Sequence, residues 1–154
     1  MKIVRSSELP WADALARGKF GSRRKPLGGE KASCGLWELA PGKCSFPLHR
    51  HHGTEEALFA ISGKAKVRTT EAETPVGPGD FVSFPAGGLA HQLVNDGSEP
   101  FVYLAIGVSS GVVDVVEYPD SGKVACRYGE AQGKNSKRWV FEEKSQVDSF
   151  KGEE

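Results

Sequence analysis

The chain has 154 residues, and its 20 lysine and arginine residues balance 20 aspartate and glutamate residues, so its formal net charge at pH 7 is zero. A chain of this length is expected to form one domain with a sizeable core, and its charge balance provides no field that would attract nucleic acid or an anionic membrane. No apolar run approaches the roughly 20 residues of a membrane-spanning helix, and the first residues lack the apolar stretch of a secretory signal. We therefore expect a single domain over residues 1–154 of a cytoplasmic protein that binds neither nucleic acid nor membranes.

The cysteines agree with a reducing compartment. Cys34, Cys44 and Cys126 are an odd number at unrelated spacings, which does not match a disulfide framework. We interpret them as reduced thiols.

The first predicted element is a short helix over residues 6–18, with Pro10 near its start and Gly18 at the position of a C-cap. The basic run that follows, residues 22–25, could bind phosphate, but no aromatic stacking partners accompany it. We expect it to be a solvated loop.

From about residue 33 the chain consists of short runs rich in Val, Phe, Leu and Ile, separated by Gly, Pro, Asn and Asp. About eight such runs at this spacing predict an all-β antiparallel sandwich or barrel. The predicted strands lie within residues 34–39, 45–51, 56–62, 64–70, 80–84, 91–95, 101–108 and 112–118, which places the barrel core at about 33–118.

Two of these runs, 56–62 and 101–108, are apolar at nearly every position, so both faces of each strand should be covered. The outer face would pack against another strand layer or a partner subunit, and a homodimer is the commonest arrangement for a soluble oligomer. The last predicted strand ends in a turn at residues 119–122, and we assign it no chemical role. Residues 129–154 form a polar extension, in which Trp139, Val140 and Phe141 predict a short packed segment before a frayed end.

The four histidines of the chain fall into two short windows, with three at residues 49–52 and the fourth at 91. Imidazole is the commonest neutral metal ligand. Because side chains alternate along a strand, His49 and His51 point to one face while His52 points to the other. A carboxylate follows at Glu55 or Glu56, and alternation admits only one of these to the same pocket without deciding which.

These windows resemble the two motifs of the cupins, and in particular the small single-domain bacterial cupins known as the cupin_2 group. The first motif is Gly, five residues, His-x-His, three or four residues, Glu, six residues, Gly; the second is Gly, five residues, Pro-x-Gly, two residues, His, three residues, Asn. The matching residues here are Gly42, His49-Arg50-His51, Glu56 and Gly63 in the first motif, and Gly79, Pro85-Ala86-Gly87, His91 and Asn95 in the second. Two intervals, Gly42 to His49 and Gly87 to His91, are one residue longer than the pattern, and both insertions fall in loops.

The resemblance implies a double-stranded β-helix, a closed jelly-roll barrel with a metal held inside, and it selects Glu56 through the spacing to Gly63. The implied metal ligands are His49, His51, Glu56 and His91. One divalent transition metal, Fe, Mn, Ni, Co or Zn, would suit three imidazoles and a carboxylate. No site for an organic cofactor is indicated, because no helix follows Gly87-Gly88.

Such a site predicts a metal-dependent enzyme that acts on a small polar molecule with vicinal oxygens, by oxygenase, isomerase or lyase chemistry. The alternative is a non-catalytic cupin that binds or senses a sugar or organic acid. No dedicated catalytic residue can be named; proton transfer would use Glu56 or a water on the metal. Strand alternation predicts a largely apolar pocket wall made of Leu58, Ala60, Leu93, Val102, Leu104 and Ile106.

Overall fold

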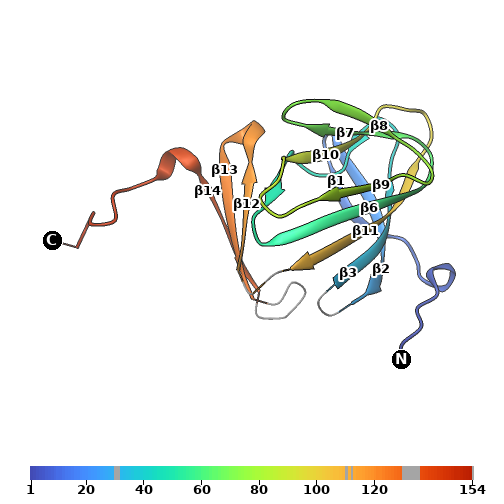
Figure 1. Ribbon diagram of the computed structural model, residues 1–154, viewed down its shortest axis with the longest axis horizontal. Helices are drawn as coiled ribbons and strands as arrows, with labels where there is room; N and C mark the ends of the chain where they lie inside the picture. The colour runs from blue at the N-terminus through green and yellow to red at the C-terminus, as the bar shows by residue number, and fades with distance from the viewer. Residues whose placement is uncertain (30–31, 110, 112, 130–135, 154) are drawn as a thin grey trace.

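The computed structural model describes residues 1–29, 32–109, 111, 113–129 and 136–153. Over this part of the chain the fold is all-β, as predicted, apart from three short 3-10 turns at Ser6–Glu8, Pro119–Ser121 and Glu143–Ser145 (Figure 1). The strands are β1 Ala12–Arg17, β2 Phe20–Gly28, β3 Ala32–Leu39, β4 Lys43–Cys44, β5 Arg50–His51, β6 Thr54–Ser62, β7 Ala65–Thr69, β8 Glu73–Val76, β9 Phe81–Phe84, β10 His91–Asn95, β11 Phe101–Ser109, β12 Val113–Tyr118, β13 Lys123–Tyr128 and β14 Lys137–Glu142.

Within the described ranges, these strands form two sheets. The larger sheet has the order β8-β7-β10-β4-β2-β3-β11-β6-β9, with β1 paired to β2, and it curls into the barrel of Figure 1. The smaller sheet has the order β14-β13-β12-β5 and stands at one side of the barrel. Because β5 belongs to it, the smaller sheet carries the first histidine window.

The predicted N-terminal helix is wrong. Residues 12–17 form β1, which pairs antiparallel with β2 through a turn that starts at Gly18, where φ is 57°. A helix this short is marginal in water even when its residues favour helix, whereas pairing with β2 satisfies the backbone groups in a ladder. The basic run is also a strand, not a loop: the cations of Arg23 and Lys25 lie 5.1 and 4.9 Å from the ring of Trp11.

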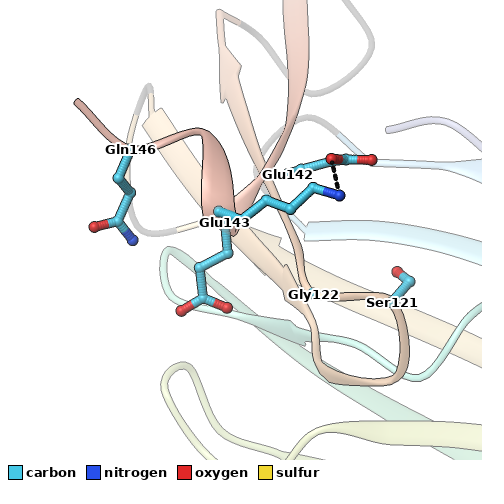
Figure 2. A pocket seen from close by; sticks show the side chains of 6 residues that line it. Ser121, Gly122, Glu142, Glu143 and Gln146 are labelled. Carbon is cyan, nitrogen blue, oxygen red and sulfur yellow. Dashed lines mark ion pairs between the residues drawn. The ribbon is translucent and has the colours of Figure 1, made fainter.

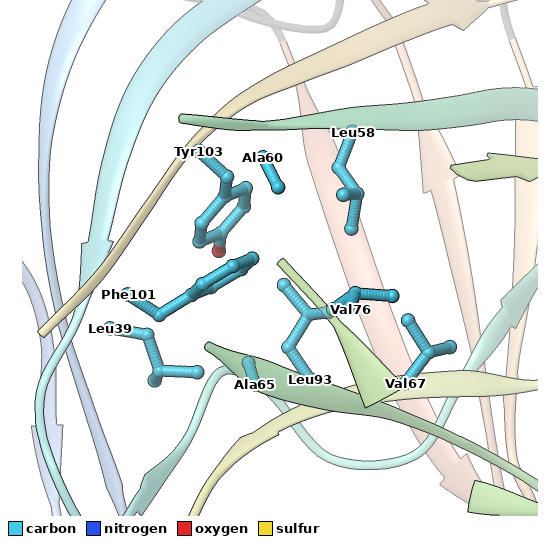
Figure 3. Close-up of a cluster of buried hydrophobic side chains, with 9 residues drawn as sticks. All are labelled: Leu39, Leu58, Ala60, Ala65, Val67, Val76, Leu93, Phe101 and Tyr103. Atoms are coloured by element: carbon cyan, nitrogen blue, oxygen red, sulfur yellow. The ribbon is translucent and has the colours of Figure 1, made fainter. Parts of the chain in front are cut away.

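The barrel interior is a packed apolar core, drawn in Figure 3 and formed by Leu39, Leu58, Ala60, Ala65, Val67, Val76, Leu93, Phe101 and Tyr103. The expected inward side chains of β6 and β10 are confirmed, but those of β11 are reversed. Tyr103 and Ala105 lie directly opposite Ala60 and Leu58, so they share the inner face. Val102, Leu104 and Ile106 therefore do not line the interior.

The C-terminal segment is joined to the rest of the protein mainly along its backbone, with a side-chain hydrogen bond from Arg138 to the hydroxyl of Tyr118. Strand β14 hydrogen-bonds to β13, yet Trp139, Val140 and Phe141 are 46%, 50% and 54% exposed. The packing expected for these three side chains is therefore not seen. Among the described residues, no helix is long and apolar enough to cross a membrane.

Gly63 occupies a turn that only glycine fits, which generates the first prediction. Its φ is 77°, and a Cβ there would lie 2.2 Å from the carbonyl oxygen of Pro100. We expect Gly63→Ala to lower the free energy of unfolding by about 3 kcal/mol, because left-handed strain and a backbone clash add. Gly18→Ala is the matched control: its φ is 57° with no atom within 4 Å of the added Cβ, so only the strain of about 1 kcal/mol applies. Urea denaturation measures both, and equal losses would refute the clash.

Candidate metal centre

The two histidine windows are joined through their backbones. The N–H of His49 donates to the carbonyl of His91 at 3.2 Å, and the N–H of His91 donates to the carbonyl of His49 at 2.8 Å. His51 follows in β5, while Glu56 comes from β6, two residues after that strand begins. The fold thus brings together, from both sheets, residues that lie up to 42 positions apart in the chain.

Three of the four predicted ligands, the histidines, converge on one carboxylate oxygen of the fourth, Glu56. Glu56 Oε2 lies 3.2 Å from the Nε2 of His91, 3.7 Å from that of His49 and 3.7 Å from that of His51. His49, His51 and Glu56 offer ligand atoms that all lie within 4.8 Å of one another, and His91 joins them through its contact with Glu56. Glu55 lies on the outer face, opposite Val108.

These distances fit a transition-metal ion. Nitrogen and oxygen ligands bind such ions at about 2.0–2.2 Å, which places neighbouring ligand atoms about 3.0–3.6 Å apart for the usual angles. The observed separations of 3.2–3.7 Å are close to that range. The donor set of imidazole and carboxylate suits Fe, Mn, Ni, Co or Zn.

Two of the histidine rings are oriented by hydrogen bonds at the nitrogen that faces away from Glu56. Nδ1 of His49 lies 2.8 Å from the carbonyl oxygen of Pro47, and Nδ1 of His51 lies 2.6 Å from Oδ2 of Asp114. Both partners are acceptors, so both Nδ1 atoms carry hydrogen and both Nε2 lone pairs face Glu56. Nδ1 of His91 is buried without a hydrogen-bond partner among the described residues.

Aromatic rings surround the histidines. The ring of Phe84 stacks on His91 with a centroid distance of 3.7 Å and an interplanar angle of 9°. Tyr118 stacks on His49 at 6.2 Å, and Phe46 meets the same ring edge-on at 6.3 Å. These contacts cover the imidazoles with apolar surface and limit the orientations that the rings can adopt.

The electrostatics favour an ionised carboxylate beside a neutral imidazole. Burial by itself would raise the pKa of Glu56, but the neighbouring His49, His91 and His51 outweigh it and hold that pKa well below its usual range. Burial lowers the pKa of His91, although its hydrogen bond to Glu56 acts in the opposite direction. Ionised Glu56 and neutral His91 are the forms that bind a metal ion.

The other candidates of the sequence lie outside this cluster. His52 points away, as expected, and its Nε2 lies 2.8 Å from Oε1 of Glu117. Asn95 is fully buried and structural: its amide donates to the carbonyls of Leu39 and Glu99 and accepts from the N–H of Gly97. Asp114 and Tyr118, which contact the ligand histidines, were not predicted from the sequence. The sequence contains one signal, for Asp114: it is an isolated aspartate within a run of valines.

A separate hollow lies away from the histidines, beside the end of β14 (Figure 2). Its volume is about 580 Å³, and it is lined by Ser121, Gly122, Glu142, Glu143, Lys144 and Gln146. None of the four predicted ligands lines it, so we do not connect it with the metal centre.

Comparisons with known proteins identify the family of this fold. A family model described as cupin domain matches residues 35–107. Glucose-6-phosphate isomerase of Thermococcus kodakarensis is 34% identical over 106 residues, which cover 65% of this chain and 48% of that enzyme. The chain thus spans about half the length of the curated relative that it matches.

Solved structures resemble the chain over most of its length. One structure from Acidithiobacillus ferrooxidans, assigned provisionally as a sugar phosphate isomerase, is 29% identical to this chain and has a TM-score of 0.79. The match covers 92% of this chain and 90% of the Acidithiobacillus chain. The sugar phosphate isomerase structure from Silicibacter pomeroyi has a TM-score of 0.77 and is 20% identical to this chain. The match covers 95% of this chain and 96% of the Silicibacter chain, and it shows that the fold is shared.

Burial of His91 predicts a pH-dependent stability of the metal-free protein. The unfolded chain takes up a proton on this histidine below about pH 6.5, while the folded protein does so only at lower pH. The free energy of unfolding should therefore fall as the pH drops from about 6.5 to the folded pKa. Urea denaturation at several pH values measures this, and His91→Gln should reduce the slope.

A direct titration of His91 by NMR tests the cause. Phe84→Leu removes the stacked ring and should move the pKa of His91 back towards its ordinary value. Phe81→Leu is the matched control, because Phe81 lies on the same strand but is 63% exposed. The same pKa in the parent and in Phe84→Leu would exclude burial under this ring as the cause.

Proposed function

Because the chain belongs to the cupin superfamily, whose domain it carries over residues 35–107, we propose that it is a metal-dependent enzyme that acts on a small polar molecule with vicinal oxygens. Of the oxygenase, isomerase and lyase chemistries, we propose isomerisation of a sugar phosphate. The observation that carries the proposal is the convergence of three imidazole Nε2 atoms on Glu56. The names of the relatives supply the reaction class.

The packed core limits where a substrate can bind. Phe101 and Tyr103 fill the barrel interior and are buried, so a substrate would approach the histidines from outside this core. There it would meet the rings of Phe46 and Tyr118 beside His49. Apolar ring surface next to a polar centre suits the mixed C–H and O–H surface of a sugar.

The residues of the site support proton transfer between adjacent carbons. Conversion of an aldose to a ketose removes a proton from C2 and returns one to C1, while a hydroxyl proton moves between O2 and O1, without net oxidation. A bound divalent ion would polarise the substrate carbonyl and make the neighbouring C–H more acidic. Each contact between a histidine and Glu56 uses Oε2, so Oε1 would be the oxygen that accepts the proton and returns it.

We also propose that the protein is a homodimer and that it works in the cytoplasm. Phe59 and Phe81 lie opposite each other on the outer face of β6 and β9, 40% and 63% exposed, and Ile61 next to them is 43% exposed. An apolar patch of this kind is typical of an interface between subunits. The three cysteines are unpaired in the fold, which agrees with the expectation of a reducing compartment.

The enzymatic proposal is tested by activity and metal content together. We expect untagged protein to contain near one equivalent of Fe, Mn, Ni, Co or Zn by elemental mass spectrometry and to interconvert glucose 6-phosphate and fructose 6-phosphate. Removal of the ion should lower the rate at least about 100-fold, and one of these ions should restore it. The double variant Glu56→Ala/His91→Ala should lose both ion and activity, whereas His52→Ala should keep both.

Two outcomes would contradict this proposal. Saturable binding of sugar phosphates without turnover would favour the alternative, a cupin that binds or senses its ligand. Protein that contains no metal and takes up none on supplementation would show that the histidines line a metal-free pocket.

The dimer is tested by sedimentation. The parent should sediment as a dimer, and Phe81→Glu should shift it towards the monomer, because a buried unpaired charge is costly at an interface. Val140→Glu, on the exposed side of β14, provides a control for the added charge. A monomeric parent would exclude the proposed interface.

A further inference from the structure

The segment after the matched cupin domain reaches back to the metal centre. Strand β12 pairs with β5, and Val116 lies directly opposite His51. Because alternate residues share a face, Asp114 lies on the same side of β12 as Val116 and faces the histidine. Asp114 is only 2% exposed, although it lies in a run of valines.

Both oxygens of this buried carboxylate are occupied. Oδ1 accepts a hydrogen bond from the N–H of Gly53 at 2.9 Å. Oδ2 lies 2.6 Å from Nδ1 of His51 and accepts from the hydroxyl of Thr54 at 3.0 Å and from a guanidinium nitrogen of Arg127 at 3.4 Å. Contacts from three strands and a loop therefore hold the carboxylate in one orientation.

We propose that Asp114 is a positioning residue for the metal centre. A carboxylate can only accept, so the 2.6 Å contact requires hydrogen on Nδ1 of His51, and in the neutral imidazole this leaves the Nε2 lone pair directed at Glu56. Partners of this kind set the tautomer of a ligand histidine and raise its basicity. The inference rests on the proposed metal-binding function and adds a residue from outside residues 35–107.

A structural role alone would predict something different. If Asp114 only tied the turn at Gly53 and Thr54 to β12, its removal would lower stability but leave the tautomer of His51 unchanged. The tautomer therefore separates the two roles. Glu117 offers a matched comparison: it is a carboxylate on the same strand that contacts His52, which points away from the site.

The experiment uses full-length, metal-free protein labelled with 15N in its histidines, at a pH above the ordinary imidazole pKa of about 6.5. The 15N shifts should show hydrogen on Nδ1 of His51 in the parent. In Asp114→Ala they should show hydrogen shifting to Nε2, the form that a neutral imidazole favours in water. Chelator competition should show metal affinity about 10- to 100-fold lower, while Glu117→Ala should match the parent in both measurements.

Three results would overturn the inference. They are hydrogen on Nε2 of His51 in the parent, an unchanged tautomer in Asp114→Ala, and a metal affinity of Asp114→Ala equal to that of Glu117→Ala. The parent measurement requires no variant, so it decides the question even if Asp114→Ala does not fold. A parent that binds no metal would contradict the proposed function, while the tautomer would still test the role of Asp114.

Discussion

The candidate site depends on one electrostatic constraint: four electron-rich atoms face one another at the end of the barrel. The Nδ1 atoms of His49 and His51 are committed to Pro47 and Asp114, so their Nε2 lone pairs must face the oxygen of Glu56. These two lone pairs lie 3.7 Å from that oxygen and are repelled by it unless a positive charge lies among them. Of the three rings, His91 is the one whose Nδ1 has no partner among the described atoms, so its hydrogen is free to lie on Nε2 and bond to Glu56. The fold thus directs three hydrogen-bond acceptors at one another, the Nε2 atoms of His49 and His51 and the oxygen of Glu56. The tautomer of His91 remains free to change.

Much of the site could be predicted from the sequence because its information is local. Alternation along the chain predicts that His49 and His51 share a face, and the all-β class follows from short apolar runs between turn residues. The exclusion of His52 follows from the same alternation. The choice of Glu56 over Glu55 also needed the spacing of the cupin motif, because the two-residue period of a strand left both residues open.

The missed features depend on long-range pairing. Residues 12–17 have helix-favouring composition, and only the ladder with β2 makes them a strand. Strand β11 is apolar at nearly every position, so its periodicity could not show which side chains point inward; the register with β6 decides that. Asp114 is 63 residues from His51, and no local pattern reports that their strands meet.

The dependence of His51 on β12 has a consequence for the order of events during synthesis. The residues of the first histidine window leave the ribosome long before Asp114 does, and the strand that carries Asp114 lies beyond the barrel strand β11. Contacts between distant segments form late because closing a long loop costs chain entropy. A nascent chain that ends before β12 would present the histidines without the group that orients His51. The proposed metal centre therefore gains the group that orients His51 only after the barrel strand β11 has been made.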